Sequence, residues 1–401
     1  MLRSMFSAIS GLRAHQTKMD VTGNNIANVN TVGYKSQSTV FEDTLSQMMR
    51  AGGAPTEARG GTNPAQVGLG VKLGGISTNW TQGATQTTGR STDFMVEGDG
   101  FFVVQAGTQQ LFTRAGSFSF DSAGNLVTAS GAVLQGWSAD ANGVVNPNGP
   151  IGDLAIPYGQ GTAPRRTGNG TVEGNLSASA PVGTAVETAI TMFDDLGREV
   201  PVTYAYSKTA DNTWGLTVTA RGATVHSSSV TFDAVTGALS SASPVTLAGI
   251  PGLTGAVSVD LSTITQYGSP TNVSADSQDG YSAGSLESFS LGSDGTVTGM
   301  FSNGERKVLG QLALAAFDNP SGLEKAGSSM FRAANNSGLP DIGQAGAGGR
   351  GTLNAGALEM SNVDLAEEFT GLIVAQRGFQ ANSRVITSSD EILQDLVNLK
   401  R

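Results

Sequence analysis

Two stretches at opposite ends of the chain share a sevenfold apolar pattern. Apolar residues recur in alternating steps of three and four positions, the spacing that lets two amphipathic helices pack along a common seam. The seam residues are Leu2, Met5, Ile9, Leu12, Met19 and Ile26 near the start, and Leu365, Phe369, Leu372, Phe379, Ile386 and Leu393 near the end. We predict that the two ends pair as helices, so that the remaining chain forms one insertion between them.

Turn and capping residues set the expected limits of these helices. Gly23 and the asparagines at 24, 25, 28 and 30 favour turns, so the first helix is expected to run from Leu2 to near Asn28. The second is expected from about Val363 to Leu399, with Asp364 among the residues that can accept the free amides of its first turn. Gly371 and Gly378 each cost roughly 1 kcal/mol relative to alanine within such a helix, so contacts outside it must compensate.

The central part of the chain reads as short strands joined by glycine-containing turns. The predicted fold is mainly β, with a terminal α-helical coiled coil and a nested multi-domain layout. Its parts are a helical domain (1–32 and 362–401), extended connectors (33–66 and 338–361), a discontinuous β core domain (67–145 and 284–337) and an inserted outer β domain (146–283). The connectors are glycine-rich and are expected to be poorly regular.

Apolar residues off the seam indicate that the paired ends need further neighbours. A single helix pair would leave these residues in water: Phe6, Ile373, Val374, Val385, Ile392 and Leu396. Many copies packed side by side would cover them. We therefore expect self-association, with the ends mobile in a monomer and helical in the assembly. An antiparallel helix pair in an ordinary monomer is the alternative.

Composition narrows the possible partners and compartments. The 401 residues include 55 glycines and no cysteine, and 23 Lys and Arg stand against 33 Asp and Glu, for a net charge of −10. This charge argues against nucleic acid and against anionic membrane surfaces. No apolar run approaches the ~20 residues needed to span a bilayer, so no membrane insertion is expected. The first residues also lack the continuous apolar core of a secretory signal peptide.

The residues that usually carry chemistry form no convincing site. His15 and His226 are the only histidines, and neither has acidic neighbours at metal-ligand spacing. Gly68, Leu69 and Gly70 imitate a dinucleotide loop, but strands rather than a helix follow. Asp194 and Asp195 fit solvated turns better than a calcium site. We predict no catalytic residues, no cofactor and no metal, and hence no enzyme.

Several longer motifs resemble the bacterial flagellar axial family of rod, hook and hook-associated proteins. The N-terminal motif SGLRAHQTKMDVTGNNIANVNTVGYKS contains the family signature residues Asn24, Asn25, Asn28, Asn30, Gly33 and Tyr34. The segments QTTGRSTDFMVEGDGFFVV and FTRAGSFSFDSAGNLVTASGAVLQGW resemble the first half of the family's core domain. The segments SNGERKVLGQLALAAFDNPSGLEKAG and LEMSNVDLAEEFTGLIVAQRGFQANSRVITSSDEILQDLVNL resemble the C-terminal half.

The resemblance implies a structural subunit rather than a catalyst. Within the family, the block from Thr171 to Val273 favours the hook over the shorter distal rod, which stays an alternative, as does a secreted β-rich adhesin or glycan-processing enzyme. Hook membership implies a flexible curved homopolymer that transmits motor torque to the filament as a universal joint. The implied partners are other copies, rod and hook-associated proteins, the hook cap and the flagellar type III export apparatus. The implied location is extracellular, in the flagellum, after export without a cleaved signal peptide.

The asparagine cluster allows two interpretations. Asn24, Asn25, Asn28 and Asn30 could simply end the first helix, or they could form hydrogen bonds across subunits in a packed inner layer. The sequence favours neither.

Overall fold

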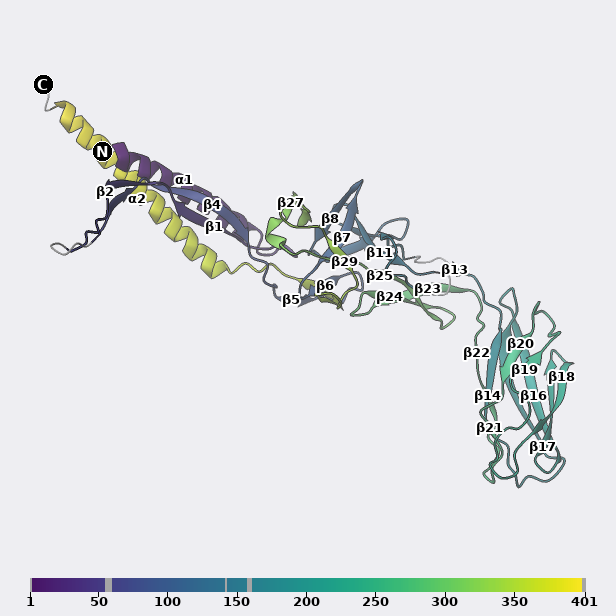
Figure 1. Ribbon diagram of the computed structural model, residues 1–401. Helices are drawn as coiled ribbons and strands as arrows, with labels where there is room; N and C mark the ends of the chain where they lie inside the picture. Colours follow the sequence, from purple (N-terminus) through teal and green to yellow (C-terminus); the bar gives the residue numbers. More distant parts are fainter. Residues whose placement is uncertain (1, 55–59, 141–142, 157–160, 399–401) are drawn as a thin grey trace. The chain divides into compact units, whose positions relative to one another are not determined.

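The protein has a helix at each end and strands between them, which confirms the predicted fold class (Figure 1). The structure is a computed structural model that describes residues 2–54, 60–140, 143–156 and 161–398, without the side chains of residues 2, 396 and 397. The chain divides into two compact units. Unit 1 comprises Met1–Ile156, Ser290–Thr298 and Val308–Arg401, and unit 2 comprises Pro157–Phe289 and Gly299–Lys307.

The two helices of unit 1 begin and end close to the predicted positions. Helix α1 spans Leu2–Ala27 and α2 spans Leu365–Asn398. The Asp364 carboxylate accepts a hydrogen bond from the Ala366 amide at 2.8 Å, and so caps α2 as predicted. The helices run antiparallel, because Gly11 lies beside Asn382 whereas Asn25 contacts Glu368.

The remaining elements of unit 1 are short strands and one 3-10 turn. They are β1 (Gln37–Asp43), β2 (Ser46–Arg50), β3 (Ala65–Gly68), β4 (Val71–Thr78), β5 (Thr85–Thr87), β6 (Phe94–Glu97), β7 (Phe101–Ala106), β8 (Gln109–Thr113), β9 (Phe118–Phe120), β10 (Leu126–Thr128), β11 (Val133–Ser138), β12 (Gly152–Asp153), β26 (Leu314–Ala316), η1 (Pro320–Gly322), β27 (Glu324–Gly327), β28 (Met330–Arg332), β29 (Asp341–Gly343), β30 (Thr352–Ala355) and β31 (Ala357–Glu359). Strands β23 (Gly284–Leu291), β24 (Thr296–Phe301) and β25 (Arg306–Leu312) contain residues of both units.

The two glycine-rich segments expected as poorly regular connectors contain several paired strands. β1 pairs with β4, and β2 pairs with β3, both antiparallel, and β1 and β4 lie along α1. The second segment contributes β29, β30 and β31, which pair with β26, β6 and β5. Backbone hydrogen bonds therefore hold both segments, although their glycine content had suggested loose chain; residues 55–59 lie outside the described residues.

The β core of unit 1 is built around aromatic side chains. Its sheet places β11 beside β7, β7 beside β8 and β8 beside β28. Trp80 packs edge-on against Phe101 and Phe331, with ring centroids 5.2 and 5.1 Å away. Phe101 and Phe331 are buried, so this aromatic cluster forms part of the hydrophobic core of unit 1.

Unit 2 is a two-sheet structure with its own closed core. Its strands are β13 (Gly161–Thr162), β14 (Asn169–Asn175), β15 (Ala185–Phe193), β16 (Glu199–Ala210), β17 (Thr213–Ala220), β18 (Ala223–Thr231), β19 (Val245–Leu247), β20 (Val257–Asp260), β21 (Ile264–Thr265) and β22 (Ser274–Gln278). Strands β15 to β18 form one antiparallel sheet, and β14 pairs with β20, β21 and β22 in the other. Buried side chains from both sheets, with Trp214, Tyr204 and Tyr206 the largest, form one cluster.

Candidate assembly site

The terminal helices approach each other closely at small and polar residues. A Cβ on Gly11 would lie 2.8 Å from the Asn382 amide nitrogen, and one on Gly378 would lie 2.5 Å from His15 Nε2. Ala8 and Ala375 are buried on the same two helices. The close approach at Gly378 therefore supplies the contact outside the helix that this residue needs. A Cβ on Gly371 would instead point into open space.

The predicted seam residues lie beside this contact. Met5, Ile9, Leu12, Met19 and Ile26 of α1 and Leu372, Phe379, Ile386 and Leu393 of α2 are half-buried. Leu365 and Phe369 are exposed, and the side chain of Leu2 lies outside the described residues. Whether these residues form the seam of an assembly stays a prediction. The signal for the close contact was present in the sequence, because Gly11 and Ala8 share one face of α1.

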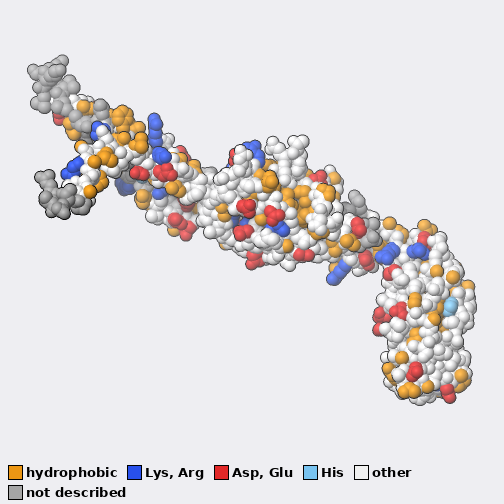
Figure 2. Space-filling model, in the orientation of Figure 1, with side chains coloured by type: hydrophobic (Ala, Val, Ile, Leu, Met, Phe, Trp, Pro, Cys, Tyr) orange, Lys and Arg blue, Asp and Glu red, His pale blue; other side chains and the backbone are white. Residues whose placement is uncertain are grey.

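Apolar side chains remain uncovered on the helices of this monomer, as the sequence predicted for Phe6, Ile373, Val374, Val385 and Ile392. Leu396 is outside the described side chains. The neighbouring β2–β3 hairpin adds Leu45, Met48, Met49 and Val67, which are also exposed. Figure 2 shows hydrophobic side chains gathered over this part of unit 1. Contiguous exposed apolar surface of this kind marks a protein interaction site.

Asn25 joins the two helices to the start of the β structure. Its side-chain nitrogen donates to Glu368 Oε1 and to the Gln37 carbonyl, both at 2.7 Å. Its side-chain oxygen accepts from the Gln37 amide at 3.0 Å and from the Tyr34 hydroxyl at 3.1 Å. Asn25 is fully buried, so all four hydrogen-bonding positions of its carboxamide are used within the chain. We call Asn25, Tyr34, Gln37 and Glu368 the joint.

The other signature residues take different roles around the joint. Asn24 donates to the Tyr34 hydroxyl at 3.1 Å, and Asn28 bonds back to the Asn24 carbonyl at 2.9 Å. Gly33 has φ +67°, and a Cβ there would lie 2.6 Å from the Ala115 amide, so only glycine fits. Asn30 is exposed. Burial, and secondarily the negative charge of Glu368, raises the pKa of Tyr34 above its ordinary value, which keeps the hydroxyl protonated.

A buried ion-pair cluster lies next to the joint. Glu359 is fully buried and accepts from Lys35 Nζ at 2.6 Å and from Arg114 at 3.5 Å. Lys35 also donates to the Thr81 carbonyl at 2.8 Å, and the Gly83 amide donates to Glu359. Burial lowers the pKa of both the Lys35 ammonium and the Arg114 guanidinium, while Glu359 opposes each shift. Such a cluster holds its segments in one arrangement, because removing one partner leaves a buried charge uncompensated.

The histidines and aspartates considered as possible metal ligands or catalytic residues lie at separate places in the fold. His15 lies at the helix contact, and His226 lies in β18 of unit 2. Asp194 pairs with Arg198 at 2.7 Å in a turn. Within the described ranges, no three His, Asp or Glu side chains are grouped as metal ligands. Over the same residues, neither helix combines the length and apolarity that crossing a bilayer requires.

Family models match most of the chain. "Flagella basal body rod protein" matches residues 5–35, and "Flagellar hook protein FlgE/F/G D1 domain" matches 95–192. "Flagellar basal body protein FlaE D2 domain" matches 162–281, and "Flagellar basal body rod FlgEFG protein C-terminal" matches 354–399. The first and last matches cover most of α1, all of α2 and every joint residue except Gln37.

Full-length relatives and a solved structure agree with these models. The flagellar hook protein FlgE of Borreliella burgdorferi is 41% identical, and the match covers 100% of both chains. The flagellar basal-body rod protein FlgG of Bacillus subtilis is 34% identical, also over 100% of both. The crystal structure of Helicobacter pylori flagellar hook protein FlgE2 matches the fold with a TM-score of 0.56 at 14% identity, covering 67% of this chain and 99% of that one. The chain belongs to the flagellar hook protein family.

Proposed function

We propose that this chain is the repeating subunit of a flagellar hook, a flexible curved tube that transmits torque from the motor to the filament. Its role is structural, without catalysis. The observation that carries the proposal is the uncovered apolar surface of the terminal helices, exemplified by Phe369 and Val374, which are 50% and 55% exposed in a single copy. Neighbouring copies would bury this surface and so stabilise a polymer.

The predicted layout assigns each region a place in that polymer. We propose that the helical domain (1–32 and 362–401) lines the channel, that the β core domain (67–145 and 284–337) forms the wall, and that the outer domain (146–283) faces outward. The seam residues of α1 and α2 would then pack between copies. The proposed location is the extracellular hook, and the proposed further partners are rod and hook-associated proteins, the cap and the type III export apparatus.

Electron microscopy of the purified full-length chain under polymerising conditions tests the proposal. We expect hollow, curved tubes above a threshold concentration. Monomers that persist at all concentrations would contradict a polymerising subunit.

A distal rod subunit is the second candidate, supported by the similarity to the Bacillus subtilis rod protein. The same images distinguish the two candidates, because straight, rigid tubes would support the rod.

A further inference from the structure

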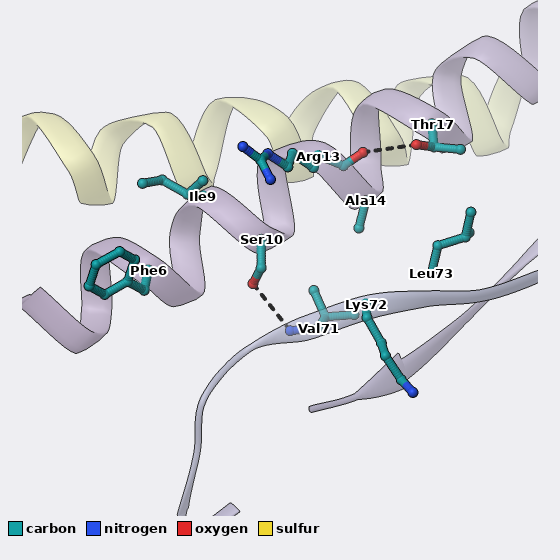
Figure 3. A pocket seen from close by; sticks show the side chains of 9 residues that line it. All are labelled: Phe6, Ile9, Ser10, Arg13, Ala14, Thr17, Val71, Lys72 and Leu73. Atoms are coloured by element: carbon teal, nitrogen blue, oxygen red, sulfur yellow. Dashed lines mark hydrogen bonds between the residues drawn. The ribbon is translucent and has the colours of Figure 1, made fainter. Parts of the chain in front are cut away.

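A groove runs between α1 and strand β4, which pairs with β1 (Figure 3). It has a volume of about 390 Å³ and is lined by Phe6, Ile9, Ser10, Arg13, Ala14, Thr17, Val71, Lys72 and Leu73. Ser10 Oγ accepts a hydrogen bond from the Val71 amide at 3.2 Å, which holds the start of β4 against α1. In Figure 3, Ala14 points from α1 toward the strand, and Leu73 points back toward α1. The groove is therefore a preformed feature of unit 1.

The groove combines apolar walls with positive charge. Its lining includes Arg13 and Lys72 but no carboxylate. Lys72 pairs with Glu42 at 3.1 Å, and both side chains remain more than half exposed. Within the part of the chain that the structure describes, Arg13 lies in no ion pair within 4.0 Å. A partner that is apolar along one edge and acidic beside it would complement these walls.

Helix α2 presents such an edge. Val374, Val385 and Ile392 are 55%, 41% and 50% exposed, and their spacings of 11 and 7 residues place them on one face. This face, which we call the stripe, differs from the face of Ala375 and Asn382 that meets α1. α2 is also acidic: apart from Glu368, which is bound within the joint, it carries four carboxylates, Glu367, Asp390, Glu391 and Asp395, against two bases, Arg377 and Arg384.

We propose that the groove of one copy receives the stripe of α2 from a second copy. The proposal rests on the proposed polymer and adds the surfaces that join its subunits. Groove and stripe are different surfaces of the same chain, so each copy can accept one neighbour and enter another. A contact of this heterologous kind extends into a ring or an open helix instead of closing as a dimer.

Cysteine pairs test the contact directly, because the chain contains no cysteine. One population carries Leu73→Cys, and the other carries Val374→Cys, Val385→Cys or Ile392→Cys. Tubes grown from the mixture are oxidised and separated on a non-reducing gel. We expect at least one stripe position to give a disulfide-linked dimer in at least tenfold higher yield than the control, Leu73→Cys with Gln380→Cys, since Gln380 is exposed on another face of α2.

The outcomes separate this proposal from the proposed function. Tubes in which no stripe position crosslinks above the control overturn the groove contact and leave the hook assignment standing. A wild-type chain that forms no tubes contradicts the hook assignment itself.

A second measurement covers cysteine variants that fail to assemble. Arg13→Glu damages the groove and Val374→Asp damages the stripe, so each variant should need at least tenfold more protein than wild type to polymerise. In a mixture, the Val374→Asp variant still offers an intact groove and the Arg13→Glu variant still offers an intact stripe. Analytical ultracentrifugation should then detect heterodimers in the mixture only. Wild-type polymerisation by either variant alone overturns the contact.

Discussion

Unit 2 and the terminal helices bury apolar surface to very different extents. Unit 2 encloses Trp214, Tyr204 and Tyr206 between two sheets, with almost no exposure of these rings. The helices meet through Gly11, Gly378 and polar side chains, and leave Phe369 half exposed. The core of the inserted region is therefore closed within one copy, whereas the ends expose apolar surface that neighbouring copies could cover.

The largest expected effect comes from opening the closed core of unit 2. Trp214→Ala should lower the free energy of unfolding of this unit by about 3–5 kcal/mol, because a large buried ring is lost. Thermal unfolding followed by far-UV circular dichroism, which does not depend on the lost tryptophan, measures this loss of stability. The variant should still form tubes. The reciprocal variant Leu372→Asp should prevent tubes while leaving the unfolding of unit 2 unchanged. If Trp214→Ala blocked assembly in a chain whose helices remained folded, the comparison would be wrong.

A smaller effect is expected at the joint. Asn25→Ala removes four hydrogen bonds and leaves the half-buried groups of Gln37 and Glu368 without this partner, which should cost the helical region about 2–3 kcal/mol. Hydrogen exchange at the α1 amides measures the loss. Asn30→Ala, at an exposed signature position, is the matched control and should change stability by less than about 0.5 kcal/mol. Equal effects at the two positions would remove the special role assigned to Asn25.

The smallest effect is expected at the helix contact. Gly378→Ala places a methyl group against His15 and should destabilise the packed helix pair by about 1–2 kcal/mol. Gly371→Ala, with open space around it, should instead stabilise α2 by up to about 1 kcal/mol. Helicity measured against temperature separates them. A stabilised Gly378→Ala variant would show that the two helices are not closely packed in solution.

Local sequence patterns predicted the ends of the helices well. They did not predict contacts between residues far apart in the chain. The end of α1 at Ala27 and the cap at Asp364 follow from neighbouring residues, so both were predicted within two positions. Glu359 and Lys35 are separated by 324 positions, and no local pattern marks them as a buried pair. Burial of Asn25 likewise depends on Glu368 from the far end of the chain.

The connector segments show why composition misled in one respect. Glycine content over 51–61 and 338–356 suggested loose chain. The second segment nevertheless contains strands β29 and β30, and in the first segment Gly53 forms an isolated antiparallel bridge with Thr62. Glycine at Gly351 allows backbone contact, because a Cβ there would lie 2.2 Å from the Glu97 carbonyl oxygen. Composition alone does not separate a flexible glycine from one required by close packing.

The segment that follows α1 and the segment that precedes α2 lie side by side, and this limits how the β core can rotate relative to the helices. The Ser36 amide donates to Asn362 at 2.8 Å, and Lys35 binds Glu359, so the outgoing and returning segments are clamped to each other. A domain joined to the helices by a single segment could rotate about the bonds of that segment. Two segments bonded to each other restrict this rotation, so the β core of unit 1 should turn together with the helices.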